Sequence, residues 1–179
     1  MRVSKESMLL YAITDKTWLG NQNLTDQVEE ILKAGVTFLQ LREKHVSKEE
    51  MLTIAKEVQT IARKYNVPFV INDDIMVAKE LDADGVHIGQ SDMEYEKARN
   101  ILGDNKIIGI SAATLEQAIA AEKCGADYIG VGAVFHTDTK TNASTVTYEK
   151  LKEIAHAVSI PVVAIGGINE GNVLELSGT

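Results

Sequence analysis

The sequence lacks cysteine pairs and long apolar runs. Cys124 is its only cysteine, which excludes an intramolecular disulfide and argues against a cysteine-rich zinc cluster. No stretch approaches the roughly 18 apolar residues that a membrane-spanning helix requires, and residues 1–14 carry no small-residue cleavage site of a secretory signal. We therefore expect a soluble chain in the reducing cytoplasm, without a membrane partner.

Positive charge is also scarce. The chain has 18 Lys and Arg residues against 26 Asp and Glu residues, a formal net charge of −8, and no run of five or six like charges. Such a chain offers no basic stripe for the phosphates of a nucleic acid. An anionic small molecule would have to be bound by cations placed locally or by a divalent metal, because the overall field of the protein repels it.

Short apolar runs bounded by Gly, Pro, Asn or Asp recur along the whole chain. They are continuous rather than alternating, which is typical of strands that are buried on both faces. The runs predict seven strands, at residues 8–14, 36–42, 67–72, 85–89, 106–111, 127–132 and 161–166.

Helical patterns lie between these runs. Ser47 with Glu50, and Thr114 with Gln117, form two capping boxes that start such patterns. Glycines follow three of the patterns, where a left-handed residue ends a helix: Gly35, Gly103 and Gly125. The alternation of strand and helix indicates an α/β fold with a parallel sheet and right-handed crossovers.

A closed barrel and an open doubly wound sheet both agree with this alternation. No G-x-G-x-x-G follows the first strand, which argues against a dinucleotide-binding sheet. Polar residues gather just after the strands, and in a TIM-type (β/α)8 barrel these positions meet at the face where active sites form. We therefore predict a single TIM-type barrel domain over residues 1–179. Seven strands are visible and the chain ends after a helical pattern at 172–176, so we expect the barrel to be C-terminally incomplete or closed by something else.

Gln40, Arg42 and Lys44 follow one another at alternate positions as the second strand ends. Their side chains are expected to point the same way. Two cations and an amide donor suit the oxygens of a phosphate, Arg as a two-pronged donor and Lys as a point charge. The alternative is a charged loop on a solvated rim.

Asp73 and Asp92 follow the third and fourth strands, so a barrel would bring them near each other. Two carboxylates together with phosphate oxygens and water make a typical Mg²⁺ site. Asp74 precedes a helical run and suits an N-cap. The alternative is that both Asp73 and Asp74 are caps or turn residues.

Three further groups suit anionic ligands. Gly166 and Gly167 end the seventh strand before a helical pattern, where backbone N–H groups can hold a phosphate, although turns use such pairs often. Thr137 and Lys140 lie in the long loop 133–146 and could close over an anion, or simply be solvated. Ser111 offers a hydroxyl but has no G-x-S-x-G elbow around it.

The sequence resembles the thiamine phosphate synthase family. The motifs QLREK, VINDD, GVHIGQSD, IIGISA, ADYIGVGAVFHTDTK and VVAIGGI occur in the order and spacing of that family, from the first strand to the seventh helical pattern. The resemblance implies a TIM barrel and a transferase. The reaction joins hydroxymethylpyrimidine pyrophosphate to a thiazole phosphate with Mg²⁺ and releases pyrophosphate.

The resemblance also implies residue roles. The residues implied to bind the pyrimidine pyrophosphate are Gln40, Arg42, Lys44 and Asn72, with Ser111 and Lys140 as further contacts to its pyrophosphate group. Asp73 and Asp92 would hold Mg²⁺, while Thr137 and the Gly167 N–H would meet the thiazole phosphate. Arg42, Lys44 and Lys140 would stabilise the leaving pyrophosphate. For the reaction that the resemblance implies we expect dissociative chemistry, which requires no protein nucleophile; the lack of a Ser/His/Asp or Cys/His arrangement in the sequence fits this.

Two other functions remain open at this point. A related thiazole tautomerase, an isomerase, would not need both aspartates together with the QLREK cations. A non-catalytic barrel could bind a phosphorylated ligand and act through a partner. Whether the chain forms a homo-oligomer is also open.

Overall fold

The computed structural model describes residues 3–90, 94–137 and 145–179. The chain divides into two compact units. The first takes the described residues of 1–88 and 92–108, and the second those of 89–91 and 109–179. Each unit is described by itself, and one domain over residues 1–179 stays a prediction.

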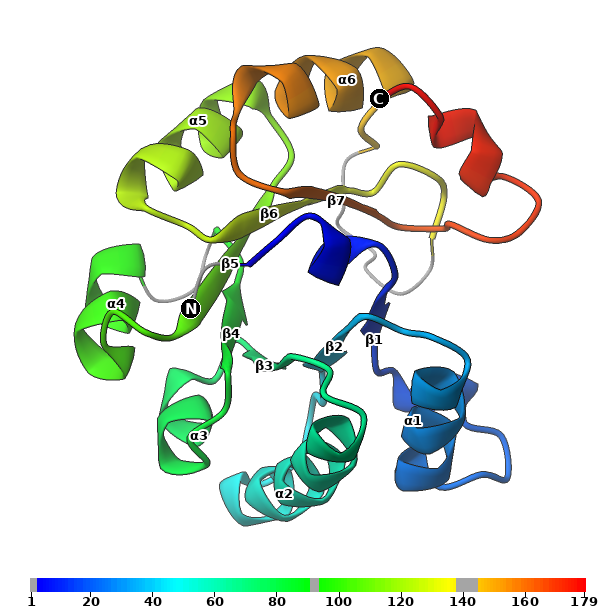
Figure 1. Cartoon of the computed structure of the whole chain (residues 1–179), viewed down its shortest axis with the longest axis vertical. Coiled ribbons are helices and arrows are strands. Elements are labelled where there is room, and N and C mark those ends of the chain that lie inside the picture. The colour runs from blue at the N-terminus through cyan, green and yellow to red at the C-terminus, as the bar shows by residue number, and fades with distance from the viewer. Residues whose placement is uncertain (1–2, 91–93, 138–144) are drawn as a thin grey trace. The chain divides into compact units, whose positions relative to one another are not determined.

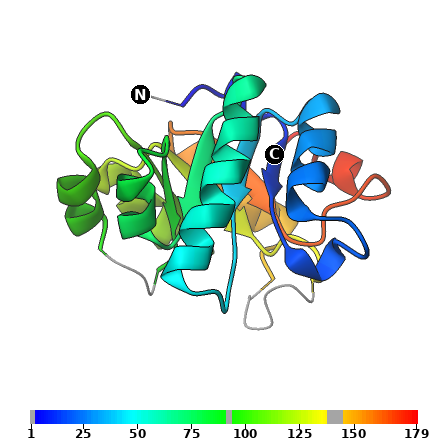
Figure 2. The ribbon, with the colours of Figure 1, turned by 90° about the horizontal axis from the view of Figure 1, so that it is seen from below.

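The first unit alternates strands and helices in parallel order (Figure 1). Its elements are η1 (Glu6–Met8), β1 (Tyr11–Ile13), η2 (Lys16–Trp18), α1 (Leu24–Lys33), β2 (Phe38–Leu41), α2 (Lys48–Lys64), β3 (Phe69–Asn72), α3 (Ile75–Glu80), β4 (Gly85–Ile88) and α4 (Tyr95–Leu102). β1 pairs in parallel with β2, β2 with β3, and β3 with β4. Figure 2 shows α1 and α2 side by side, and an ion pair of 2.6 Å between Lys64 Nζ and Glu29 Oε1 joins them.

The second unit continues the same alternation. β5 (Ile107–Ala112) begins in the first unit and ends in the second, where it is followed by α5 (Leu115–Cys124), β6 (Tyr128–Gly132), α6 (Tyr148–Ala157), β7 (Val162–Ile165) and η3 (Val173–Leu176). β5 pairs in parallel with β6, and β6 with β7. Tyr128 and Ile129 of β6 and Ile154 of α6 are fully buried.

All seven predicted strands are present, with one clear difference in length. The first was predicted over 8–14 but β1 covers only Tyr11–Ile13. Met8 ends the 3-10 helix η1, because the Ser4 hydroxyl accepts the Ser7 N–H at 3.2 Å and so favours a turn. The pattern at 172–176 likewise forms the 3-10 helix η3 rather than an α-helix.

The predicted helix ends are confirmed. Ser47 Oγ accepts the Glu50 N–H at 3.1 Å, and Thr114 Oγ1 accepts the Gln117 N–H at 3.3 Å. The three glycines predicted to end helices, Gly35, Gly103 and Gly125, all have positive φ. Gly125 is left-handed as predicted, whereas Gly103, with a φ of 84° and a ψ of 174°, is not. Within the described residues, no helix has the length and apolarity needed to cross a bilayer.

Gly85 at the start of β4 provides a test of the packing in the first unit. A Cβ at this position would lie 1.9 Å from the carbonyl oxygen of Ile107, and backbone cannot move away cheaply. We expect Gly85→Ala to lower the free energy of unfolding by about 3 kcal/mol, measured by urea denaturation. Gly171→Ala is the control, because the nearest atom there is Asn169 Oδ1 at 3.2 Å in an exposed segment. Equal losses in the two variants would contradict the close approach of Gly85 to Ile107.

Candidate active site

The end of β2 holds Gln40, and the cations Arg42 and Lys44 follow it. Gln40 is only 2% exposed, and its Nε2 donates to the Tyr11 hydroxyl at 2.7 Å. Arg42 is half-buried and Lys44 is exposed. The three side chains therefore lie at different depths, and one N–H of the Gln40 amide is already used inside the protein.

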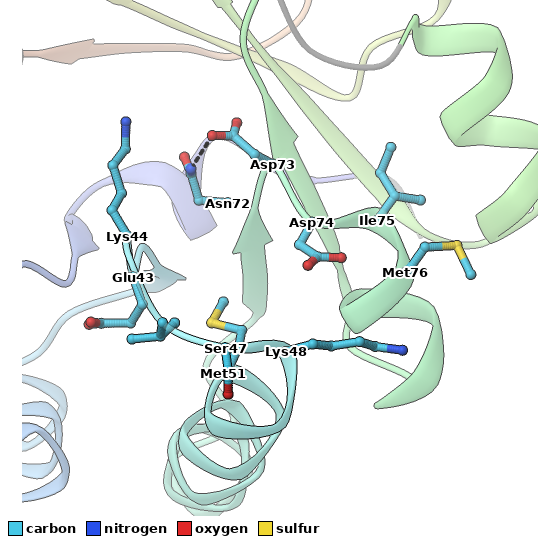
Figure 3. Close-up of a pocket in the computed structure, with 11 residues that line it drawn as sticks. Glu43, Lys44, Ser47, Lys48, Met51, Asn72, Asp73, Asp74, Ile75 and Met76 are labelled. Atoms are coloured by element: carbon cyan, nitrogen blue, oxygen red, sulfur yellow. Dashed lines mark hydrogen bonds between the residues drawn. The ribbon is translucent and has the colours of Figure 1, made fainter.

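The end of β3 separates the two neighbouring aspartates. Asp73 has a φ of +62°, its N–H donates to the His87 carbonyl at 2.9 Å, and its Oδ2 accepts from Asn72 Nδ2 at 2.6 Å. Asp74 Oδ1 instead accepts the Val77 N–H at 2.9 Å and caps α3. The two carboxylates point away from each other (Figure 3). The prediction that Asp74 is a cap is thus confirmed, and Asp73 stays available as a ligand candidate.

A cavity of about 450 Å³ lies between the loop after β2 and the loop after β3. Its lining is mostly polar, with Glu43, Lys44, Ser47, Lys48, Asn72, Asp73 and Asp74, and its apolar members are Val46, Met51, Ile75 and Met76. In Figure 3 the Lys44 side chain extends along the side that holds Asn72 and Asp73. This edge of the first unit therefore offers a cation, an amide and a carboxylate to one ligand.

Of the two aspartates predicted to bind a metal, the structure describes only Asp73. Asp92 lies outside the described residues, as does Lys140 of the long loop. In the part of the chain that the structure describes, no three His, Cys, Asp or Glu residues form a metal cluster. A Mg²⁺ site with Asp73 as one of two carboxylates stays a prediction.

The second unit places Gly167 against the segment that leads to Thr137. Phe135 N–H donates to the Gly166 carbonyl at 3.0 Å, and a Cβ on Gly167 would lie 2.3 Å from the His136 carbonyl oxygen. Gly167 also has a φ of +65°, so only glycine suits this position. The contact brings the β7 turn and the start of the long loop together within this unit.

Ser111 lies near the end of β5 and is half-buried. Its backbone carbonyl accepts Gln90 Nε2 at 2.7 Å. Sequence reasoning did not assign Gln90 a partner, since this bond joins residues 21 positions apart.

Three residues of the first unit were missed as parts of the site. Thr14 is 4% exposed, and its Oγ1 accepts the Arg42 N–H at 2.9 Å. Lys16 Nζ lies 3.1 Å from Glu43 Oε2, and the Glu43 side chain is 2% exposed. The only signal in the sequence was that Lys16 follows a predicted strand, as the other site residues do.

Asp15 is a further charged group near Arg42. A hydrogen bond of 2.6 Å from the Thr17 hydroxyl lowers the pKa of Asp15, and the positive charge of Arg42 contributes to the same shift. Asp15 also caps η2 by accepting the Thr17 N–H at 3.0 Å. It is therefore a local structural acid whose charge lies near Arg42.

The chain is similar to a family of known proteins. A family model described as thiamine monophosphate synthase matches residues 10–179. A thiamine-phosphate synthase of Clostridium tetani is 48% identical over 170 residues, which cover 95% of this chain and 81% of the relative. A thiamine-phosphate synthase of Methanobrevibacter smithii is 48% identical over 168 residues, covering 94% of this chain and 80% of the relative.

Solved structures support the fold. A thiamine phosphate pyrophosphorylase from Pyrococcus furiosus is 42% identical and has a TM-score of 0.88, with 96% of this chain and 81% of that chain covered. An N-acetylmannosamine-6-phosphate 2-epimerase from Clostridium perfringens shares the fold alone, at 15% identity and a TM-score of 0.64 over 94% of this chain and 81% of that chain. The chain thus has the TIM-like α/β fold that its sequence predicts, with seven parallel strands in the described residues.

The left-handed backbone at Asp73 allows conformation and charge to be separated. Asn tolerates this region of φ as Asp does, whereas a β-branched residue is strained there. We expect Asp73→Asn to change the free energy of unfolding by less than about 0.5 kcal/mol, and Asp73→Val to lower it by about 1–2 kcal/mol. Urea denaturation of both variants measures the difference. Equal stability of the two would show that position 73 is not held at positive φ.

Proposed function

The chain belongs to the thiamine monophosphate synthase family, and from this premise we propose how its residues act. It is a thiamine-phosphate synthase, which is a transferase of thiamine biosynthesis. The substrates are hydroxymethylpyrimidine pyrophosphate and a thiazole phosphate. The bond between the pyrimidine methylene carbon and the pyrophosphate oxygen breaks, and the electron pair leaves with pyrophosphate. The thiazole nitrogen then uses its lone pair to form the new carbon–nitrogen bond, which gives thiamine phosphate.

The observation that carries this proposal is the polar edge of the cavity in the first unit. Lys44, Asn72 and Asp73 line the same cavity, so groups that suit a phosphate and a group that suits a divalent metal occur together. Pyrophosphate leaves readily only when its developing negative charge is met by fixed positive charge. The net charge of −8 makes such local cations necessary.

Arg42 and Lys44 would bind the pyrophosphate oxygens, with Asn72, Ser111 and Lys140 as further contacts. Gln40 would contact the pyrimidine end of the same substrate, because it is buried and one of its N–H groups is bonded to Tyr11. Thr137 and the backbone N–H of Gly167 would hold the thiazole phosphate.

Mg²⁺ is the cofactor that we propose. Asp73 suits it, because its carboxylate is exposed at the cavity and Mg²⁺ needs few protein ligands. Asp92 would be the second ligand. When bound, Mg²⁺ supplies positive charge to the pyrophosphate oxygens.

The reaction needs no nucleophile from the protein. The electron-rich pyrimidine stabilises the cation that forms when pyrophosphate departs, and the protein holds the two substrates in line. The surrounding residues would exclude water, which otherwise would capture that cation. A cytoplasmic location, expected from the single cysteine, belongs to the same proposal.

Product formation tests the function directly. The chain is mixed with the two substrates and Mg²⁺, and thiamine phosphate and pyrophosphate are measured with and without a chelator. We expect both products in equal amounts, and loss of both with the chelator. Isomerisation of the thiazole phosphate without coupling would indicate a tautomerase instead, and binding without turnover would indicate a non-catalytic barrel.

The two adjacent aspartates offer a matched pair of variants. We expect Asp73→Asn to lower kcat by about 100-fold, because one preorganised charge contact is lost. Asp74→Asn should stay close to the parent chain, since Asn caps a helix as well as Asp does. Steady-state rates at saturating Mg²⁺ measure both. A normal rate for Asp73→Asn would remove Asp73 from the metal site.

A further inference from the structure

The segment that follows β1, residues 14–16, makes two contacts with the segment that follows β2. Both contacts reach residues of the 42–44 stretch, which the proposed function uses to bind pyrophosphate. Neither Thr14 nor Lys16 has a role in that function as described above. The contacts therefore call for an explanation of their own.

The first contact continues the strand pairing beyond its regular end. The backbone ladder of β1 and β2 ends with Ile13 opposite Gln40, and the Thr14 N–H then donates to the Gln40 carbonyl at 3.0 Å. For the next hydrogen bond along the pair, the Thr14 side chain replaces a backbone acceptor: its Oγ1 accepts the Arg42 N–H at 2.9 Å. The backbone of Arg42 is thus fixed to β1 by a buried side chain.

The second contact is an ion pair with unequal burial. Glu43 Oε2 lies 3.1 Å from Lys16 Nζ, and the side chains are 2% and 41% exposed. Lys16 Nζ also lies 3.8 Å from Glu50 Oε1 at the start of α2. Within the described residues Glu43 Oε1 is buried and has no hydrogen-bond partner. Lys16 is accordingly the cation that compensates a buried carboxylate.

A buried carboxylate of this kind is a poor source of stability. Removal from water is unfavourable for the charge, and a single partner seldom outweighs that loss, so an apolar residue of similar size often serves stability as well or better. Its position suggests a geometric role instead. Glu43 lies between Arg42 and Lys44, and Figure 3 shows the Glu43 and Lys44 side chains leaving the chain in different directions.

We propose that Lys16 and Glu43 are positioning residues. They hold in place Arg42 and Lys44, the two pyrophosphate-binding cations that together form the pyrophosphate clamp. The ion pair anchors the Glu43 side chain on the β1 side of the chain, while Thr14 anchors the backbone of Arg42. With those two points fixed, the peptide between them has little freedom, and Lys44 is presented to the cavity. The proposal rests on the proposed function, because it assumes that Arg42 and Lys44 bind pyrophosphate.

Glu43→Met separates positioning from simple electrostatics. The variant removes one negative charge, so a general field effect would strengthen the binding of an anion. Positioning predicts the opposite, because Met has about the right length to fill the buried space but cannot hold Lys16. We expect the Kd of inorganic pyrophosphate, measured calorimetrically with Mg²⁺, to rise about tenfold. The KM of the pyrimidine pyrophosphate should rise with it, while the KM of the thiazole phosphate stays unchanged.

Variants of Lys16 complete the test. Lys16→Met should weaken pyrophosphate binding to a similar extent, Lys16→Arg should restore most of it, and the double variant Lys16→Met with Glu43→Met should be no weaker than either single one. Lys64→Met is the matched control. It breaks the ion pair of 2.6 Å with Glu29 between α1 and α2, in the same unit but away from the clamp, and should leave the Kd unchanged.

Unchanged or tighter pyrophosphate binding by Glu43→Met would overturn the proposal, as would a loss in Lys16→Met that Lys16→Arg does not restore. Arg42→Met distinguishes this failure from failure of the proposed function. If Arg42→Met binds pyrophosphate normally, the clamp itself is wrong. If Arg42→Met weakens binding and Glu43→Met does not, the clamp is right and only its positioning by Lys16 and Glu43 is wrong. Thermal unfolding of each variant checks that the chains compared are folded.

Discussion

Parallel pairing of neighbouring strands in a fixed register is the constraint on which the candidate site in the first unit depends. The register sets Ile13 beside Gln40, Leu41 beside Ile71, and Asn72 beside His87. Because all of these strands run the same way, the residues that follow them leave the sheet at one edge. A slip of one residue would turn every side chain of a strand to the opposite face. The polar lining of the cavity is therefore a consequence of the pairing that also buries the apolar faces.

Short-range chemistry of the site was readable from the sequence. Ser47 and Asp74 cap their helices through bonds that span three positions, and such bonds depend only on residue types at known spacing. The seven strands were readable for a similar reason, because continuous apolar runs between turn residues need no knowledge of the partner strand. The first strand was predicted too long, since the apolar content of residues 8–10 outweighed the local turn that Ser4 starts.

Bonds between segments distant in the sequence were not readable. Gln40 was predicted to donate its amide to a phosphate. One of its N–H groups instead donates to the hydroxyl of Tyr11, which lies 29 positions away in the sequence. Glu43 was assigned no role from the sequence, and only the fold shows that its side chain is buried against Lys16. The Gln40–Tyr11 hydrogen bond and the Glu43–Lys16 ion pair both depend on the pairing of β1 with β2. The roles given to Asp92 and Lys140 stay predictions, because these residues lie outside the described part of the chain.

A carboxylate beside an anion-binding stretch is at first sight unfavourable, since it should weaken the field of its neighbours. Two features limit that effect in this chain. The carboxylate of Glu43 is matched by Lys16, so the pair as a whole carries no net charge towards the ligand. Alternation along an extended chain also directs Glu43 away from the side taken by Lys44. Asp73 and Asp74 both line the cavity, and there the Asp74 carboxylate serves as a helix cap while Asp73 remains the candidate metal ligand. An acidic protein can thus keep many carboxylates close to an anion site, provided that each one is either paired or turned towards a metal.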